Sequence, residues 1–439
     1  MVLRRVAVVG AGAAGLCAAR HILSRLDRFA PPVVFELGDK VGGTWCYEDR
    51  VMGDAGRPAV HSSMYRDLRT NLPKEVMMFP DFPFESQLSS FLPHQEIQRY
   101  LEKYCQKYNV LPHIRFNTMV DKVKPVVAEK EEEKEEKEEK EEERETWEVT
   151  SSDLSGRQRT ETFDSVFVCS GHYSEPHIPH IPGMDHFKGT VLHSHSYRCA
   201  EPFAGQSVLV LGAKASGLDI SIELAGVGAQ VTLSHGQPLL TCPLPVGVHQ
   251  SSPMVSVDED GSLRLQDGSA VAAEVLMFCT GYKYRFPFLD GPQLGLQLED
   301  HLLAPLYRHL MPPAFPSLFF IGMCKLICPF PNFHCQVQFS LAVLDGSVSL
   351  PPRVQREDEA RRVLQEKEEQ GVERRHLLVL QAEQWEYCGA LARAAGFAPL
   401  PAAVRSLYEE VWLQRREDSQ NYRRRNYRLV GDERWEQID

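Results

Sequence analysis

The sequence lacks both an apolar run of membrane-spanning length and an excess of positive charge. Its 439 residues contain no stretch of about 20 consecutive apolar residues, the length that a helix needs to cross a bilayer. The net charge is -12 at pH 7, whereas nucleic-acid binding and attraction to anionic lipid both require a basic face. We therefore expect no nucleic-acid partner and no membrane anchor.

The cysteines lack regular spacing. There are 11 of them, and none forms a Cys-x-x-Cys motif. An odd, scattered count in a long chain favours reduced thiols and a cytoplasmic location. The nearest approach to a cluster is Cys324, Cys328, His334 and Cys335, whose spacing matches no common zinc site. We interpret these thiols as small buried apolar groups and predict no metal site.

One segment has no apolar residue at all. Residues 129–145 contain only Glu, Lys and Arg. Their Glu-to-Lys spacing could support a single solvated helix, but without an apolar face the segment cannot pack against a core. Strand-like patterns flank it at 114–126 and 146–153. We predict an insertion that decorates a hairpin of the first domain, and an acidic docking role stays open.

Two stretches of the chain repeat the same local pattern. Hydrophobic residues make up 43% and charged residues 25%, which is ordinary for globular proteins. Residues 6–9 predict a buried strand, followed by a glycine-rich turn, a helix from about residue 13 and a strand that ends at 36. Residues 205–236 repeat this order. We predict an α/β fold with two dinucleotide-binding, Rossmann-like domains.

The first repeat contains Gly10, Gly12 and Gly15 in the pattern G-x-G-x-x-G. Gly10 permits a tight turn, Gly12 lets a pyrophosphate approach the backbone, and Gly15 lets the helix pack closely on the strand. Ala13 and Ala14 fall in the first turn of the helix, whose amides and partial positive charge attract phosphate. These five residues are predicted to bind a dinucleotide.

Residues beyond the loop suggest which dinucleotide binds. Glu36 ends the second strand, where a carboxylate can accept hydrogen bonds from ribose hydroxyls. The motif "GGTW" follows at 42–45, and an extended flavin cofactor needs such a glycine-aromatic segment along the path to its ring. We therefore predict that Glu36, Gly43, Thr44 and Trp45 contact FAD.

Three further segments resemble one known family. Residues 187–197, "FKGTVLHSHSY", have the form F-x-G-x-x-x-H-x-x-x-Y, and "FCTGY" and "NLPKEVMMFPDFPF" stand at 278–282 and 71–84. Together they resemble the fingerprints of flavin-containing monooxygenases, most closely the soluble, S-oxygenating GS-OX-like branch. Baeyer–Villiger relatives usually end the first motif in Trp, whereas this chain has Tyr197.

The resemblance implies a domain order and a chemistry. An NADPH domain, 198–324, would be inserted into an FAD domain made of 1–197 and of 325–439, the latter with C-terminal helices. NADPH would reduce FAD, and a C4a-hydroperoxyflavin formed with O₂ would transfer one oxygen atom to the sulfur or nitrogen of a small thioether or amine. The substrate is then the nucleophile, so no Ser-His-Asp constellation is needed. A homodimer is what the resemblance implies for the oligomeric state.

The resemblance also assigns roles around Asn71. This residue matches the family's active-site asparagine, whose amide can donate to the flavin peroxide or to the nicotinamide cofactor. Thr70, next to it, is predicted to contact the cofactor as well. His193 and Tyr197 lie in the fingerprint that joins the two domains, and we expect a structural role for both.

The second glycine loop departs from the family pattern at one position. Gly212, Ser216, Gly217 and Asp219 match and are predicted to bind NADPH. Lys214 replaces the middle glycine. Its side chain should hinder the closest approach of pyrophosphate to the backbone, but its ammonium can pair with a phosphate, so we predict that it also contacts the cofactor.

Two other departures leave questions open. Where many relatives place an Arg for the 2′-phosphate of NADP, this chain has residues 234–236, "SHG", so its selectivity for NADPH over NADH is open. His334 stands where the family usually has Glu, while Gln336 matches a Gln that returns to the flavin. We predict a contact between Gln336 and FAD.

Three alternatives remain. A disulfide reductase of the two-dinucleotide class would need a redox cysteine pair, which the sequence lacks. A Baeyer–Villiger-type oxygenase is disfavoured by Tyr197, although its flavin chemistry is shared. A catalytically weakened flavin- or nucleotide-binding redox protein is kept open by Lys214, Gly236, His334 and the Glu/Lys segment 129–145.

Overall fold

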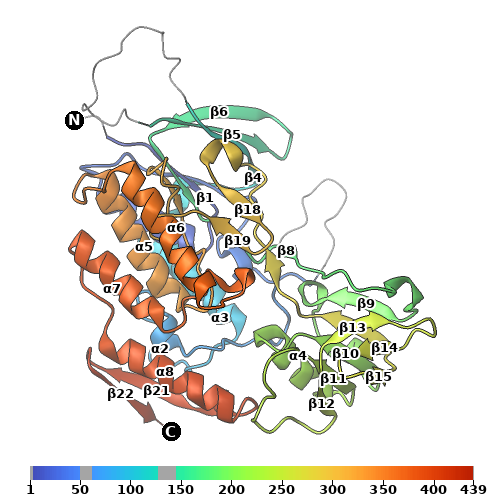
Figure 1. The fold of residues 1–439 in the computed structure, drawn as a ribbon. Coiled ribbons are helices and arrows are strands. Elements are labelled where there is room, and N and C mark those ends of the chain that lie inside the picture. The colour runs from blue at the N-terminus through green and yellow to red at the C-terminus, as the bar shows by residue number, and fades with distance from the viewer. Residues whose placement is uncertain (1–2, 50–61, 127–144, 439) are drawn as a thin grey trace.

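The computed structural model describes residues 3–49, 62–126 and 145–438. Apart from Glu145, the Glu/Lys insertion lies outside the described residues, and so do the predictions made for it. The rest forms two α/β domains, each built on a parallel sheet (Figure 1). This confirms the predicted fold class.

The first sheet has five parallel strands in the order β20–β7–β1–β2–β3. They are β1 (Val6–Val9), β2 (Val33–Phe35), β3 (Ile114–Arg115), β7 (Ser165–Val168) and β20 (Leu318–Phe320). β1 and the start of α1 (Ala13–Leu23) lie where the sequence predicts them. Burial on both faces accounts for the unbroken apolar runs of β1, β2 and β20.

Alternate residues of β1 serve the two faces of this sheet. Val6 and Val8 pack in a core with α1, α3 (His94–Lys107) and α5 (Pro329–Leu344). Ala7 and Val9 pack in a second core with an antiparallel sheet. That sheet consists of β4 (Thr118–Pro125), β5 (Trp147–Asp153) and β6 (Gln158–Phe163). The sheet is therefore sandwiched between helices and a small sheet.

The second domain repeats this plan. Its parallel sheet has the order β12–β11–β10–β16–β9. α4 (Ala215–Gly226) covers one face and an antiparallel sheet, β13–β14–β15, covers the other. The strands are β9 (Thr190–His193), β10 (Ser207–Leu211), β11 (Gln230–Ser234), β12 (Val248–Ser251), β13 (Met254–Val257), β14 (Leu263–Leu265), β15 (Ala270–Val271) and β16 (Val275–Phe278).

Strand pairing differs from the domain limits 1–197, 198–324 and 325–439 at two points. β9 precedes residue 198 but pairs with β16 in the second sheet, and β20 precedes residue 325 but pairs with β7 in the first. The family resemblance suggested those limits, whereas hydrogen bonds between distant strands show which sheet each strand belongs to. We propose that the second domain begins before β9 and ends before β20. The chain enters and leaves it at a two-stranded link, β8 (Glu175–Pro176) with β17 (Tyr282–Lys283).

The part after residue 325 is mainly helical and ends in a hairpin that the sequence analysis did not predict. It contains α5, α6 (Arg353–Glu369), α7 (Glu383–Ala395) and α8 (Ala402–Glu417), but closes with a hairpin of β21 (Asn426–Val430) and β22 (Arg434–Ile438). The turn residue Gly431 has a positive φ of 71°, which suits a hairpin turn. Tyr427 is buried by packing against α8 residues.

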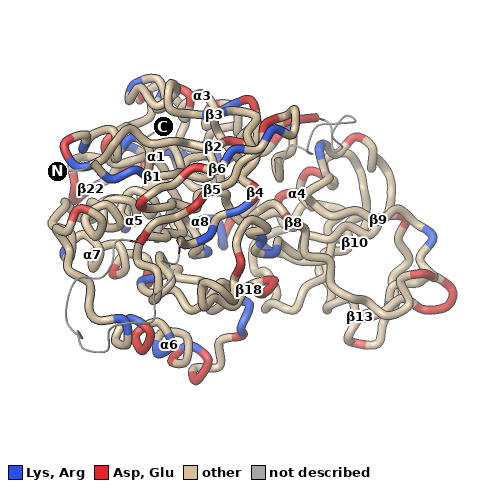
Figure 2. The backbone as a smooth tube through the Cα atoms, turned by 90° about the horizontal axis from the view of Figure 1, so that it is seen from above, with Lys and Arg blue, Asp and Glu red and all other residues tan. Residues whose placement is uncertain are grey.

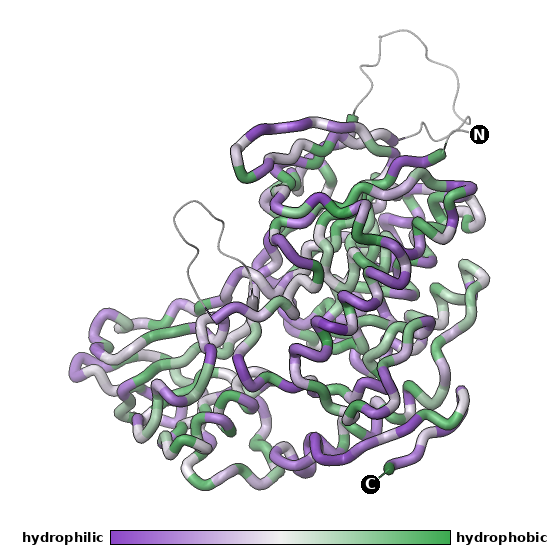
Figure 3. The backbone as a smooth tube through the Cα atoms, turned by 180° about the vertical axis from the view of Figure 1, so that it is seen from behind, coloured by the Kyte–Doolittle hydropathy of each residue, from purple (hydrophilic) through white to green (hydrophobic). Residues whose placement is uncertain are grey.

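The remaining pieces are short. They include α2 (Lys74–Met77) and a hairpin of β18 (Gln297–Glu299), which is exposed, with β19 (Leu302–Ala304), which is buried. Hydrophobic segments gather in the interiors of both domains (Figure 3). Lys and Arg are interspersed with Asp and Glu (Figure 2), notably along α6 with its Arg353–Glu357 and Arg361–Glu357 pairs. Among the helices of the described residues, none is long and apolar enough to span a membrane.

Candidate functional site

The first glycine loop follows β1 at the carboxyl edge of the first sheet. Gly10 has φ +104°, and a Cβ there would lie 2.6 Å from the carbonyl oxygen of Cys169. A Cβ on Gly15 would lie 1.8 Å from the Gly10 oxygen. Glycine is therefore required at both positions. Ala13 and Ala14 form the first turn of α1 and are buried, so this helix begins directly behind the loop.

The "GGTW" segment lies against this loop. A Cβ on Gly12 would come 3.4 Å from the Cα of Gly43, and one on Gly43 would come 2.9 Å from the Cα of Gly12. Gly43, Thr44 and Trp45 form a short 3₁₀ turn, and the hydroxyls of Thr44 and Ser63 lie 3.0 Å apart. The two backbones therefore pack directly against each other with no side chain between them, as expected where a dinucleotide approaches the loop.

Glu36 braces the first loop from the end of β2. Its carboxylate accepts hydrogen bonds from the backbone N–H of Ala11 and of Gly38, both at 2.7 Å. Burial raises the pKa of Glu36, and these two N–H donors partly offset that rise. A carboxylate has more lone pairs than these two bonds use. The predicted ribose contact therefore stays open to it.

The second glycine loop has the same geometry as the first. Gly212 has φ +109°, and a Cβ there would lie 2.6 Å from the oxygen of Cys279. A Cβ on Gly217 would lie 1.7 Å from the Gly212 oxygen. Gly212 and Gly217 thus correspond to Gly10 and Gly15. Cys279, which follows β16, corresponds to Cys169, which follows β7. Ser216 lies half-buried in the first turn of α4.

Lys214 fits this loop without backbone strain. It caps α4 with φ -76° and ψ -165°, while Gly12 caps α1 with φ -73° and ψ -174°. Any residue adopts this extended conformation. Burial, and after it the nearby Arg375, lowers the pKa of Lys214. Among the described residues no carboxylate lies within ion-pair distance of its ammonium, so that charge is available to a phosphate.

Asn71 lies between Thr70, which is hydrogen-bonded to Leu92, and the start of α2. The backbone N–H of Thr70 donates to the Leu92 oxygen at 2.8 Å, and the Thr70 hydroxyl accepts from the Leu92 N–H at 3.0 Å. The Thr70 side chain is therefore already engaged. Asn71 is half-buried, and within the described part of the chain no residue hydrogen-bonds its amide. This leaves the predicted donor free to act.

Asp219 is engaged by a residue that the sequence did not single out. Two guanidinium nitrogens of Arg423 donate to its carboxylate at 3.2 and 2.6 Å, and the third, Nε, donates to the backbone oxygen of Thr70 at 3.0 Å. The only signal in the sequence was the basic run 423–425, which is usual for an exposed surface. The predicted contact between Asp219 and NADPH competes with this bidentate pair.

The interdomain fingerprint has a structural role at His193 and Tyr197. His193 donates from Nε2 to the Gly281 oxygen at 3.0 Å and accepts the His195 N–H on Nδ1 at 3.0 Å. Burial lowers the pKa of His193 to about 4. The Tyr197 hydroxyl donates to Glu223 of α4 at 2.8 Å. Both side chains thus fasten the fingerprint to the second domain.

Both ends of the Gln336 amide form hydrogen bonds within the protein. Its oxygen accepts the Gly322 N–H at 2.8 Å and its nitrogen donates to the Tyr387 hydroxyl at 3.0 Å. Gly322 has φ +83° and follows β20. Gln336 therefore fixes the turn at the carboxyl edge of the first sheet. Because both ends of the Gln336 amide are engaged, Gln336 would affect FAD through the Gly322 turn that it holds.

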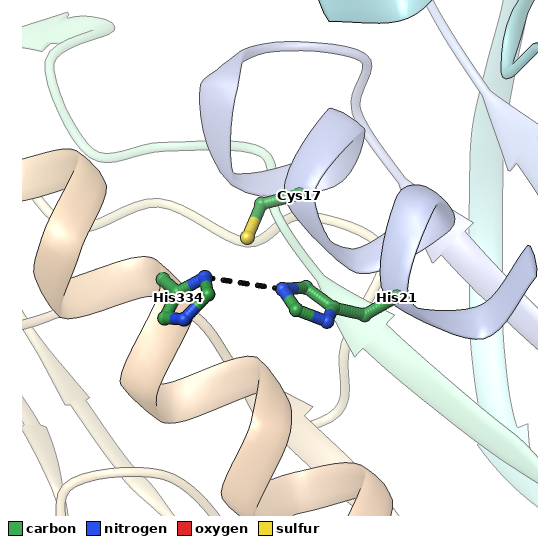
Figure 4. Close-up of side chains that lie close together, drawn as sticks. All are labelled: Cys17, His21 and His334. Carbon is green, nitrogen blue, oxygen red and sulfur yellow. Dashed lines mark hydrogen bonds between the residues drawn. The ribbon is translucent and has the colours of Figure 1, made fainter. Parts of the chain in front are cut away.

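His334 does not join the cysteines near it in sequence but meets Cys17 and His21 of α1 (Figure 4). The ligating atoms of the three residues lie within 4.8 Å of one another. His21 Nε2 lies 3.2 Å from His334 Nδ1, His21 Nδ1 lies 2.9 Å from Arg20 Nη1, and His334 Nε2 lies 2.8 Å from the Gln338 amide.

These contacts decide between a metal site and a structural pair. Arg20 can only donate, so Nδ1 of His21 accepts and its Nε2 carries the proton. The His21 Nε2–H donates a hydrogen bond to Nδ1 of His334, so the proton of His334 is on its Nε2. This Nε2–H donates to the side-chain oxygen of Gln338, with the Gln338 amide assigned in the orientation that turns its oxygen toward the ring. Each ring nitrogen is thereby used, and a guanidinium is the wrong neighbour for a metal-binding imidazole. We interpret the cluster as a tie between α1 and α5.

Comparison with known proteins agrees with this geometry. The model of the flavin-binding monooxygenase-like family matches residues 3–240 and 245–438. The flavin-containing monooxygenase FMO GS-OX5 of Arabidopsis thaliana is 38% identical over 412 residues, covering 90% of this chain and 85% of its own length.

Two solved structures are similar over nearly the whole chain. S-allyl-L-cysteine S-oxygenase from Allium sativum has a TM-score of 0.84 and 35% identity, covering 96% of this chain and 95% of its own. Tmm from Pelagibacter sp. strain HTCC7211 has a TM-score of 0.83 and 27% identity, covering 99% and 96%.

Proposed function

Because the chain belongs to the flavin-binding monooxygenase-like family, we propose that it oxygenates small molecules at a soft sulfur or nitrogen atom, with thioethers as the preferred class. It is a flavin monooxygenase that depends on FAD and NADPH. Similarity to S-allyl-L-cysteine S-oxygenase supports sulfur as the acceptor. The single structural observation that carries the proposal is the pair of matching glycine loops, one in each domain.

The chain's own residues bind and orient. The loop with Gly10, Gly12 and Gly15 would hold the FAD pyrophosphate, and the loop with Gly212 and Gly217 would hold that of NADPH. When bound, FAD supplies the reaction with O₂, and one oxygen atom passes to the substrate while the other leaves as water. The thioether sulfur is itself the nucleophile, so the protein need not supply a general base.

Asn71 is the residue proposed to act on the reacting atoms. Its half-buried amide has no hydrogen-bond partner among the described residues and can donate to the oxygen being transferred or to the nicotinamide. A positioned amide donor of this kind stabilises negative charge that develops on the reacting oxygen.

Purified protein supplied with FAD, NADPH and air tests the function. A panel of thioethers and tertiary amines is added, and NADPH consumed, oxide formed and hydrogen peroxide released are measured together. Sulfoxide or N-oxide formed in proportion to NADPH supports the proposal. NADPH oxidation with peroxide alone would favour a weakened redox protein, and esters formed from ketones would favour a Baeyer–Villiger-type oxygenase.

We also propose a location and an assembly. All 11 cysteines are free, which supports a reducing, cytoplasmic compartment. A homodimer is proposed from the family, and sedimentation equilibrium tests it.

A further inference from the structure

The segment between α8 and β21 lies between the two dinucleotide-binding domains. Arg423 is its central residue, and the Arg423 and Asp219 side chains are only 18% and 13% exposed. The Arg423 guanidinium donates to Thr70 in the first domain and to Asp219 in the second. Arg423 is 353 residues from Thr70 and 204 residues from Asp219 along the chain.

The segment is fastened to the second domain by two further contacts. Gln420 donates from its amide nitrogen to the Pro243 oxygen at 2.9 Å. The Cys242 thiol lies 3.3 Å from the Ser419 hydroxyl, and both residues are buried. The stretch before Arg423 thus lies beside the second domain, whose loops come close to the end of α8 (Figure 1).

The same segment is fastened to the first domain on its other side. The ring of Tyr422 packs edge-on against Phe91 with centroids 5.2 Å apart. The Ser90 N–H donates to the Asn426 side chain at 2.9 Å, and the Ser90 hydroxyl accepts the Tyr427 N–H at 2.8 Å. Arg423 is therefore presented by a rigid support that contacts both domains.

The Arg423 guanidinium thus forms a bridge between the Thr70 oxygen and the Asp219 carboxylate. Each end of this bridge lies next to a segment with a proposed role in the reaction. Thr70 immediately precedes Asn71, and Asp219 lies in α4 two residues after Gly217 of the second loop. We propose that Arg423 is a positioning residue, which through Asp219 holds the Asn71 loop at a fixed place against the NADPH-binding domain. The inference rests on the proposed function, since it assigns Arg423 a part in that reaction.

Lysine cannot replace this arginine. The guanidinium is a planar fork with five N–H donors, and here its three nitrogens address two groups in different domains. An ammonium is a single point that can satisfy the carboxylate or the carbonyl in the required geometry. Arg423→Lys therefore keeps the charge but loses the bridge.

We expect the bridge to determine how much of the oxygen is transferred to substrate and how much is released as hydrogen peroxide. Without it, NADPH still binds the glycine loop and FAD is still reduced, but the Asn71 amide is no longer held in register with the second domain. A displacement of about 1 Å can cost about a hundredfold in a positioned reaction. We expect product formation to fall between about tenfold and a hundredfold, with peroxide replacing product.

The test compares Arg423→Gln, Asp219→Asn and the double variant, because the double variant leaves no buried charge without its partner. Arg423→Lys is added as the conservative change. Arg428→Gln is the matched control, since Arg428 pairs with Glu436 on the exposed hairpin. FAD content, melting temperature, the KM for NADPH and the ratio of product to peroxide are measured for each.

A lower product-to-peroxide ratio in the double variant and in Arg423→Lys, with FAD content and melting temperature equal to those of Arg428→Gln, supports the inference. An unchanged ratio overturns it. A ratio that falls only together with FAD content also overturns it, because the role is then structural.

Failure of the proposed function is recognised separately, since the wild-type protein then forms no oxide. In that case amide hydrogen exchange with NADP⁺ bound decides the inference. Faster exchange around Thr70 and in α4 of the double variant supports the bridge, and unchanged exchange refutes it.

Discussion

At the scale of single residues, the proposed chemistry depends on two side chains, Asn71, which matches the family pattern, and Lys214, which departs from it. Asn71 presents an amide that no described residue uses. Lys214 adds a cation at the position where the first loop has Gly12, on a backbone of the same conformation. Each can be removed with little expected change in the fold.

Asn71→Ala should bind FAD normally and still be reduced by NADPH. Loss of a preorganised donor costs about a hundredfold in the step that it serves, so most of the NADPH consumed should yield hydrogen peroxide. Oxide and peroxide are quantified per NADPH. Gln87→Ala, which truncates an exposed amide in the same domain, is the control, and equal coupling in both variants would refute the role.

Lys214→Glu should raise the KM for NADPH by about tenfold or more, because a like charge now faces the phosphates. Lys214→Gly should be far milder, since the backbone already has the conformation of Gly12. Initial rates at several NADPH concentrations and ionic strengths measure both. A KM that is the same in both variants contradicts a role for the charge.

At the scale of elements, the His21–His334 contact joins α1, which starts at the first glycine loop, to α5. Burial lowers the pKa of His21 well below its ordinary value and that of His334 to about 4. Both rings are thus neutral in the folded protein at pH values where the unfolded chain is protonated. The tie holds only while they stay neutral.

Stability should therefore fall as the pH drops below about 6.5, the ordinary histidine pKa. The unfolded chain binds protons there that the folded chain does not, which costs about 1.4 kcal/mol per pH unit for each such histidine. The loss continues down to the folded pKa. Denaturant melts between pH 7 and 5 should show a shallower slope for His334→Gln than for the wild type, with His249→Gln, at an exposed site of β12, unchanged. Equal slopes for all three would contradict this assignment.

The elements also show what a sequence can and cannot reveal. The glycine loops were predictable because strand, turn and helix follow one another within about 30 residues. Arg423 was not, because its partner lies 204 residues away and a basic run ordinarily indicates solvent. The His21–His334 pair, 313 residues apart, and the final hairpin likewise depend on tertiary packing, which local pattern does not encode.

At the scale of the whole molecule, the two domains share one plan, and the Glu/Lys segment accounts for much of the net charge. Residues 129–144 carry six of the twelve net negative charges of the chain. The hairpin that flanks them is already closed, since the Val126 N–H donates to the Thr146 oxygen at 2.7 Å and Pro125 pairs with Trp147.

Replacing residues 127–144 with a short Gly-Asn turn should thus leave FAD content, kcat and KM within about twofold of wild type, because ends that are already adjacent need little loop to join them. Melting temperature and steady-state kinetics measure the effect. A large loss of activity would show that the acidic insertion has a docking role.

The edge strand β20 has a consequence for how the protein is made. It pairs with β7 but is translated only after the whole of the second domain. The inserted domain is one continuous stretch and can fold while it emerges from the ribosome, whereas the flavin-binding sheet must wait with an open edge. We therefore expect the second domain to complete its fold before the first sheet closes, because only the first sheet waits for a strand that is translated later.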